Sequence, residues 1–156
     1  MRKQLVAAAV AAIALCTPAA AGAKGPESAS LTGPGLDQRS LTVAGQGEMG
    51  PGTPLGTLVD AGGFFAQMYG QIPDPTSKAR PRGGSLGPHY RITYVVPGPN
   101  GIRSRVVQDV YPYAVPVPLT YMKPGQRFWV DKRAHGGWYR SSAALRQVLV
   151  RAGLHR

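Results

Sequence analysis

One stretch of this chain alternates apolar and polar residues, and it constrains the fold more than any other feature. In residues 90–96, Tyr90, Ile92, Tyr94 and Val96 alternate with Arg91, Thr93 and Val95. The Pro- and Gly-rich residues 97–101 then mark a turn, and residues 102–111 run back. Alternation on both sides of such a turn predicts an antiparallel β-hairpin.

The register of this hairpin decides which side chains share a face. If the loop is symmetric, Val96 lies opposite Ile102, Ile92 opposite Val106, and His89 opposite Asp109. The apolar face, expected in the core, then consists of Tyr90, Ile92, Tyr94, Val96, Ile102 and Val106. The opposite face is wet and mostly positive, with His89, Arg91, Thr93, Arg103, Arg105 and Asp109. A slip of one residue at the turn would exchange the two faces.

Two helices complete the expected fold. The chain holds 21 Gly and 15 Pro in 156 residues, which excludes a large helical protein. A capping box at Thr57 predicts a mid-chain helix that ends near Gly70. Ser141 or Ser142 caps a second helix with an apolar stripe at Leu145, Val148, Leu149 and Ala152. The predicted class is α+β: a small antiparallel sheet with a central β-hairpin, a mid-chain helix and a C-terminal helix packed on the sheet.

The first 23 residues read as a secretory signal peptide. Arg2 and Lys3 precede an apolar run over residues 5–15, and small residues follow. The run is about 11 residues long, shorter than the roughly 20 that a membrane-spanning helix needs, so no transmembrane segment is expected. We expect cleavage after Ala23, or after Ala21, and export from the cell. Lipidation at Cys16 is the alternative, although bulky Leu15 fits a lipoprotein signal poorly.

Two parts follow the signal peptide, and the second contains a long loop. Residues 24–56 form a Gly- and Pro-rich N-terminal segment in which residues 28–32 and 40–44 are candidates for paired strands. Residues 57–156 form the α+β domain, with further strand candidates at 119–122 and 127–130. Within it, residues 71–88 have no hydrophobic period and read as an exposed basic loop.

Charge and residue types exclude several kinds of chemistry. The formal net charge is +11, and loss of Arg2 and Lys3 leaves +9. Cys16 is the only cysteine, so the exported domain has no disulfide and no thiolate chemistry. The three histidines lack metal-ligand spacing, so neither a metal nor another cofactor is expected.

A serine-hydrolase pattern is present but lacks its structural context. Residues 83–87 match G-x-S-x-G, and Ser85, Asp109 and His135 follow the chain order of an α/β-hydrolase triad. A nucleophile elbow requires a strand before the serine and a helix after it, whereas Pro81 and Pro88 flank this one. His89 opposite Asp109 has two interpretations, a poised acid-base pair or an ordinary surface hydrogen bond.

Aromatic and basic residues gather between residues 111 and 140. Aromatic rings stack on sugar faces, while Arg and Lys pair with phosphate or carboxylate. The competing interpretation is that these rings simply build the core. Together with the wet face of the hairpin, the region gives these candidate ligand-binding residues: Arg91, Arg103, Arg105, Lys132, Arg133, Trp138, Tyr139 and Arg140.

Three short segments resemble small secreted proteins of high-GC actinobacteria whose function is unassigned. The segments are residues 111–114 (YPYA), 121–126 (YMKPGQ) and 136–140 (GGWYR), the last followed by an amphipathic helix. The resemblance implies a secreted α+β domain and transfers no catalytic residue.

These features favour a secreted, non-enzymatic domain that binds an anionic cell-envelope polymer or a protein partner. Specific binding of nucleic acid is not expected, because the chain is exported. One alternative is a small cell-wall hydrolase, and another is a secreted inhibitor with residues 97–101 as its exposed reactive loop.

Overall fold

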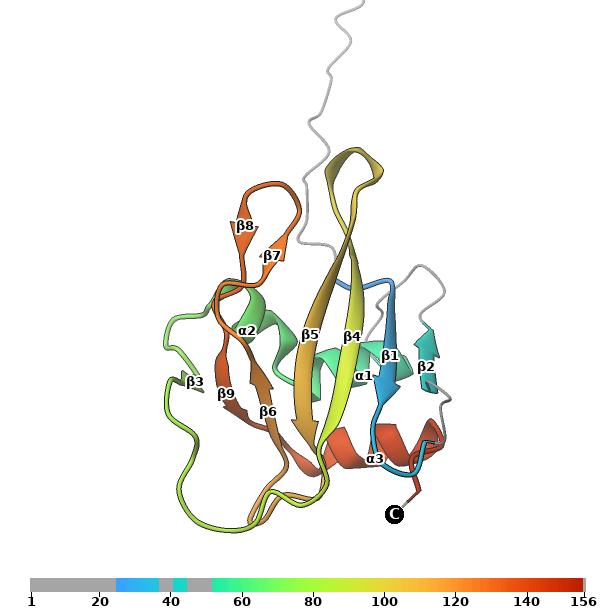
Figure 1. The fold of residues 1–156 in the computed structure, drawn as a ribbon, viewed down its shortest axis with the longest axis vertical. Coiled ribbons are helices and arrows are strands. Elements are labelled where there is room, and N and C mark those ends of the chain that lie inside the picture. Colours follow the sequence, from blue (N-terminus) through green and yellow to red (C-terminus); the bar gives the residue numbers. More distant parts are fainter. Residues whose placement is uncertain (1–24, 37–40, 45–51, 156) are drawn as a thin grey trace, which may run out of the picture.

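A seven-stranded antiparallel sheet forms the fold together with three α-helices, which lie on one side of it (Figure 1). The computed structural model describes residues 25–36, 41–44 and 52–155. The strand order in the sheet is β2-β1-β4-β5-β6-β9-β3, and β7 and β8 form a separate two-stranded hairpin. The strands are β1 (Ser28–Thr32), β2 (Leu41–Ala44), β3 (Thr76–Ser77), β4 (Tyr90–Pro97), β5 (Arg103–Tyr111), β6 (Leu119–Met122), β7 (Arg127–Phe128), β8 (Lys132–Arg133) and β9 (Gly137–Arg140). The helices are α1 (Pro54–Ala61), α2 (Phe64–Tyr69) and α3 (Ala143–Arg151).

This architecture confirms the predicted α+β class. The hairpin of β4 and β5 lies at the centre of the sheet, and α3 lies behind it in Figure 1. Ile92, Tyr94 and Val106 from the hairpin and Leu145 and Leu149 from α3 are all fully buried in one core cluster. The apolar stripe of the last helix therefore packs as its spacing predicts.

The predicted register of the hairpin is wrong by two residues. Val96 pairs with Ser104 rather than Ile102, because the short 3-10 turn Pro99–Gly101 widens the loop. Ile102 thus lies beyond the last pair of the ladder and is 37% exposed instead of joining the core. A shift of two residues keeps every strand side chain on its predicted face, because side chains alternate with period two.

The mid-chain helix begins earlier than predicted and is interrupted. Thr53, not Thr57, is the N-cap, since its side chain accepts a hydrogen bond of 3.0 Å from the N–H of Gly56 and Pro54 fills the first helical position. Gly62 and Gly63 then separate α1 from α2. Gly63 has φ +67°, and a Cβ there would lie 2.5 Å from the ring of Tyr139. This close approach and the left-handed backbone explain the glycine at position 63, while a Cβ at Gly62 would lie 2.8 Å from the carbonyl oxygen of Leu58.

A buried polar network joins the helix break to the sheet. The carbonyl of Gly62 accepts hydrogen bonds from Gln108 Nε2 (2.9 Å) and Thr120 Oγ1 (2.8 Å). Gln67 Nε2 donates to the carbonyl of Gly137 at 2.8 Å, at the first residue of β9. Because all three side chains are buried, these bonds fix β5, β6 and β9 relative to the helices.

Residues 24–56 contribute two strands to the sheet. β1 pairs with β2, as predicted, and β1 also pairs with β4. Ala29 and Leu31 are buried in the core, and the boundary expected at Thr57 falls inside α1. The predicted signal peptide, with both cleavage positions and Cys16, lies outside the described residues. Within the described ranges, no helix has the length and apolar character needed to cross a membrane.

Candidate functional site

The helices cover one face of the sheet, and we call the other the open face. Six residues form a row across it, each the direct partner of the next: Thr32, Arg91, Asp109, Tyr121, Trp138 and Ser77. Direct partners in an antiparallel ladder point to the same side of a sheet. The row therefore brings a cation, a carboxylate and two aromatic rings from four neighbouring strands onto one surface.

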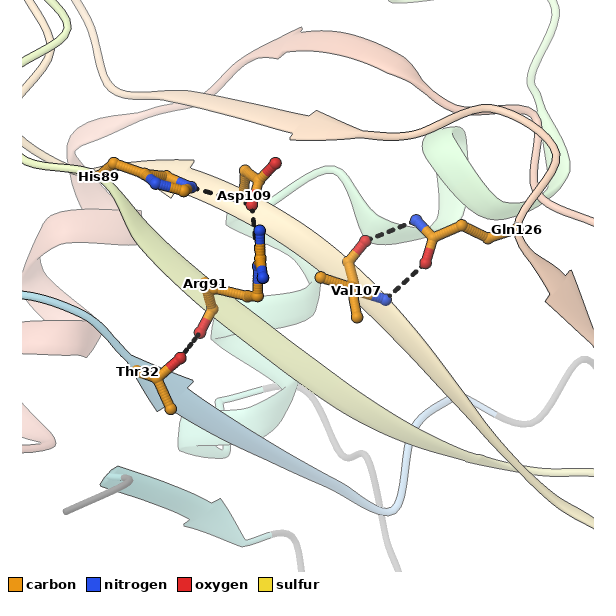
Figure 2. Close-up of polar contacts among 6 residues, drawn as sticks. All are labelled: Thr32, His89, Arg91, Val107, Asp109 and Gln126. Carbon is orange, nitrogen blue, oxygen red and sulfur yellow. Dashed lines mark hydrogen bonds and ion pairs between the residues drawn. The ribbon is translucent and has the colours of Figure 1, made fainter. Parts of the chain in front are cut away.

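The charged part of this row centres on Asp109 (Figure 2). Its Oδ1 lies 2.9 Å from His89 Nε2 and accepts a hydrogen bond of 3.3 Å from Arg91 Nε. His89 reaches Asp109 even though the direct strand partner of Asp109 is Arg91. Arg91 is 55% exposed and uses one of its five N–H donors here, so most of its guanidinium remains available to an anion from solvent.

Gln126 completes β5 at the point where β6 turns away. Its side-chain amide accepts from the N–H of Val107 at 2.9 Å and donates to the carbonyl of Val107 at 2.7 Å (Figure 2). The amide thereby replaces one strand pair on this edge of β5. Two hydrogen bonds to one residue hold the loop that leads to β7 against the sheet.

Four rings form a continuous stack on the open face, which we call the ring ladder. It runs from His89 to Tyr111, then Trp138, then Tyr121, with centroid distances of 5.2, 5.7 and 4.9 Å. The interplanar angles are 25°, 26° and 36°, so the first two pairs are stacked and the pair of Trp138 and Tyr121 is tilted. Such contacts add to the packing energy and fix the rings before any ligand arrives.

The predicted basic loop, residues 71–88, is not wholly a loop, because Thr76 and Ser77 form the edge strand β3. The residues after β3 run past the ring ladder. Burial, and after it the charge of Asp109, raises the pKa of Tyr111, while the cations Arg80 and Arg91 oppose this rise. Arg80 belongs to the loop, so at least one of its cations lies near the ladder. The loop is held in place where the N–H of Val115 donates to the carbonyl of Ser85 at 2.9 Å.

A hollow adjoins each end of the ring ladder. Beyond Tyr121 lies a groove of about 500 Å³, lined also by Asp74, Thr76, Lys78, Pro124, His135, Gly136 and Gly137. Beyond His89 lies a shallower hollow of about 430 Å³, lined also by Thr32, Gly33, Pro34 and Arg91. Both hollows therefore combine a ring at one end of the ladder with a basic side chain.

The groove holds a second contact between an aspartate and a histidine. Asp74 Oδ2 lies 2.8 Å from His135 Nε2, and Asp74 Oδ1 accepts a hydrogen bond of 2.8 Å from the N–H of Thr76. The backbone N–H of Thr76, its side chain and His135 lower the pKa of Asp74 below its usual value. Asp74 is therefore a carboxylate at neutral pH and can accept a hydroxyl hydrogen bond.

The structure brings some of the predicted ligand residues together and separates others. Arg91, Arg103, Arg105, Trp138 and Arg140 lie on the open face, where Arg103 Nε contacts Glu27 Oε1 at 2.6 Å. Tyr139 points to the helix side instead, as the residue after Trp138 in a strand must, and its ring packs at Gly63. Lys132 and Arg133 are exposed in the β7–β8 hairpin.

Sequence reasoning missed several residues of this surface. Tyr111 was detectable, because it continues the alternation of Arg105, Val107 and Asp109 along β5. Asp74 and His135 are 61 positions apart, and only the pairing of β3 with β9 brings their segments together. The sequence carries no spacing signal for such a pair.

The suspected serine-hydrolase triad is not assembled. Asp109 contacts His89 and Arg91, while His135 contacts Asp74. Ser85 Oγ instead accepts a hydrogen bond of 3.2 Å from the N–H of Gly87. Among the described residues, no group of three or more His, Cys, Asp or Glu side chains is placed to hold a metal ion.

Comparison of the chain with family models, curated proteins and solved structures finds no match. The resemblance to small secreted actinobacterial proteins stays a prediction.

Proposed function

We propose that this chain is an exported, non-enzymatic binding domain that holds an anionic polymer of the cell envelope on the open face of its sheet. The observation that carries the proposal is the cross-sheet row, which sets Arg91 beside a preformed stack of aromatic rings. Helices cover the other face, so the open face is the broad surface that a long polymer can lie along.

The balance of charge on the open face favours an anionic ligand. β4, β5 and β9 place Arg91, Arg103, Arg105 and Arg140 on this face, whereas Asp109 and Glu27 are the carboxylates that pair with them. Arg105 and Arg140 make no ion pair with any residue that the structure describes. A surface with surplus positive charge attracts a polyanion and raises its local concentration.

Binding, rather than hydrolysis, suits the surroundings of the two histidines. Each has its Nε2 directed at a carboxylate, and in the described part of the chain neither contacts a serine hydroxyl. Both His–Asp pairs lie at the ladder ends, where they supply hydrogen-bonding groups to a ligand. The role that we assign to them is recognition.

Sedimentation with purified cell wall tests this proposal. The domain should be retained at about 0.15 M salt, where the Debye length is about 8 Å, and largely released at about 1 M, where it is about 3 Å. Wall stripped of its anionic polymer is the control and should retain little protein. Equal retention on stripped and intact wall would contradict the proposal.

A further inference from the structure

We infer that the two ends of the ring ladder are subsites for sugar rings. This inference rests on the proposed function and narrows it: the ligand is an anionic polymer that contains sugar, rather than a bare polyphosphate or polycarboxylate. Each subsite combines one free aromatic face with a cation and a hydrogen-bonding group.

Stacking within the ladder leaves its outer rings as the ones that a ligand can cover. Trp138 stacks with Tyr111 and with Tyr121, and no close ring pair among the described residues joins Tyr111 directly to Tyr121. Trp138 therefore lies between the two tyrosines, and Tyr111 likewise lies between His89 and Trp138. The inner rings already have ring neighbours, whereas Tyr121 and His89 each line a hollow.

The groove at Tyr121 has the composition of a carbohydrate subsite. Its volume of about 500 Å³ is within the range of about 300–1,000 Å³ that small-molecule sites have. The ring of Tyr121 offers an apolar face to the C–H groups of a sugar, and the Asp74 carboxylate accepts hydrogen bonds from hydroxyls. Lys78 adds a cation for a phosphate or carboxylate substituent.

The Asp74 carboxylate is positioned before any ligand binds. Both of its oxygens are already held, one by the N–H of Thr76 and the other by His135. An ionised carboxylate has about four lone-pair sites, so these two contacts leave acceptor capacity for sugar hydroxyls. A bare polyphosphate has no hydroxyl to donate and would meet only repulsion from Asp74.

The hollow at His89 repeats the same combination. Thr32 and Arg91 line it, and the Thr32 hydroxyl donates a hydrogen bond of 3.5 Å to the carbonyl of Arg91, which leaves its oxygen as an acceptor (Figure 2). Three ring-to-ring steps of 5.2, 5.7 and 4.9 Å separate this subsite from the one at Tyr121. The two subsites therefore lie at the two ends of one line of ring contacts, so one polymer chain can contact both.

Three soluble polymers separate the contributions of charge and sugar. Dextran sulfate carries both, polyphosphate carries charge without sugar, and dextran carries sugar without charge. In a Trp129→Phe variant, Trp138 is the single fluorescent indole, and it lies next to Tyr121 in the ladder. Dextran sulfate should change this fluorescence and bind more tightly than polyphosphate at equal salt, whereas dextran alone should bind weakly.

Replacing the end ring tests the subsite directly. Tyr121→Leu keeps an apolar side chain in β6 but removes the aromatic face, so affinity for dextran sulfate should fall by about three- to tenfold. Affinity for polyphosphate should not change. Tyr69→Leu, which removes a 38% exposed ring on α2, is the matched control and should leave both affinities unchanged. Thermal unfolding of each variant verifies that the fold is intact.

The outcomes distinguish this inference from the proposed function. Equal affinities for dextran sulfate and polyphosphate, both unaffected by Tyr121→Leu, would overturn the sugar subsites and leave the polyanion proposal standing. No binding of either charged polymer would overturn both. A selective loss of dextran sulfate binding in Tyr121→Leu would support the inference.

Discussion

Trp138 and Tyr121 are direct partners in β9 and β6, and their ring centroids lie 4.9 Å apart on the open face. The next residue, Tyr139, points to the opposite side and packs against the backbone of Gly63. One short strand thus supplies a ring to the candidate site and a ring to the interior. Substitutions at Trp138 should therefore act mainly on ligand binding, and those at Tyr139 mainly on stability.

Gly63→Ala should destabilise the domain more than an alanine at another left-handed glycine. Gly63 and Gly125 have φ +67° and +78°, but a Cβ meets the Tyr139 ring at Gly63 and nothing within 4 Å at Gly125. Both variants incur the cost of a left-handed alanine, and Gly63→Ala adds overpacking of about 1–3 kcal/mol. Urea unfolding of the two variants measures this difference. Equal losses in the free energy of unfolding would show that the Tyr139 ring moves aside without cost.

Leu149→Ala should lower the free energy of unfolding by about 2–5 kcal/mol, because it removes a fully buried side chain from the contact between α3 and the sheet. Val150→Ala changes the neighbouring position, which is 45% exposed, and should cost much less. Chemical denaturation gives both values. A loss under about 1 kcal/mol for Leu149→Ala would place α3 outside the core.

Asp74 should titrate below the ordinary aspartate pKa of about 3.9. A lowered pKa in the folded state stabilises the fold above that ordinary value, and this stabilisation is lost as the pH falls through the lower folded value. NMR titration of the side-chain carboxyl measures the pKa of Asp74 in the folded protein. His135→Ala should leave most of the shift, because the N–H of Thr76 is its largest cause. An unshifted pKa in the unmodified protein would show that the turn does not hold the carboxylate.

Export should remove the predicted signal peptide. The mass of the exported protein should correspond to an N-terminus at Lys24 or Gly22, because small residues precede both positions. A lipid-modified Cys16 would instead support anchoring to a membrane surface by lipid.

Alternation made the fold and part of the site predictable. The faces of β4 and β5 survived a register error of two residues because period two assigns faces without knowledge of the turn. Alternation could not predict where α1 begins. Thr53 before Pro54 and Thr57 before Asp60 are both plausible caps, and only packing selects one. Gln108 lies on the buried face, and the sequence does not reveal its partners at Gly62 and Gln67.

The remainder of the site depends on tertiary pairing that local patterns do not encode. Trp138 and Tyr139 were predicted to bind together, although adjacent strand residues face opposite sides. The ring ladder draws its members from β5, β6, β9 and the residue before β4, so it exists only once these segments are neighbours. The shared face of the hairpin arginines depends only on the pairing of β4 with β5, so the sequence could predict it.

If the proposed function is correct, the open face, rather than net charge alone, binds the polyanion. Two double variants lower the charge equally: Arg103→Ala with Arg105→Ala on the open face, and Arg146→Ala with Arg151→Ala on α3. The measurement is the slope of log affinity for dextran sulfate against log salt concentration, which reports the number of ionic contacts. The slope should flatten by about one to two for the open-face pair and stay unchanged for the α3 pair. Equal flattening in both variants, or a larger change in the α3 pair, would contradict the proposed function.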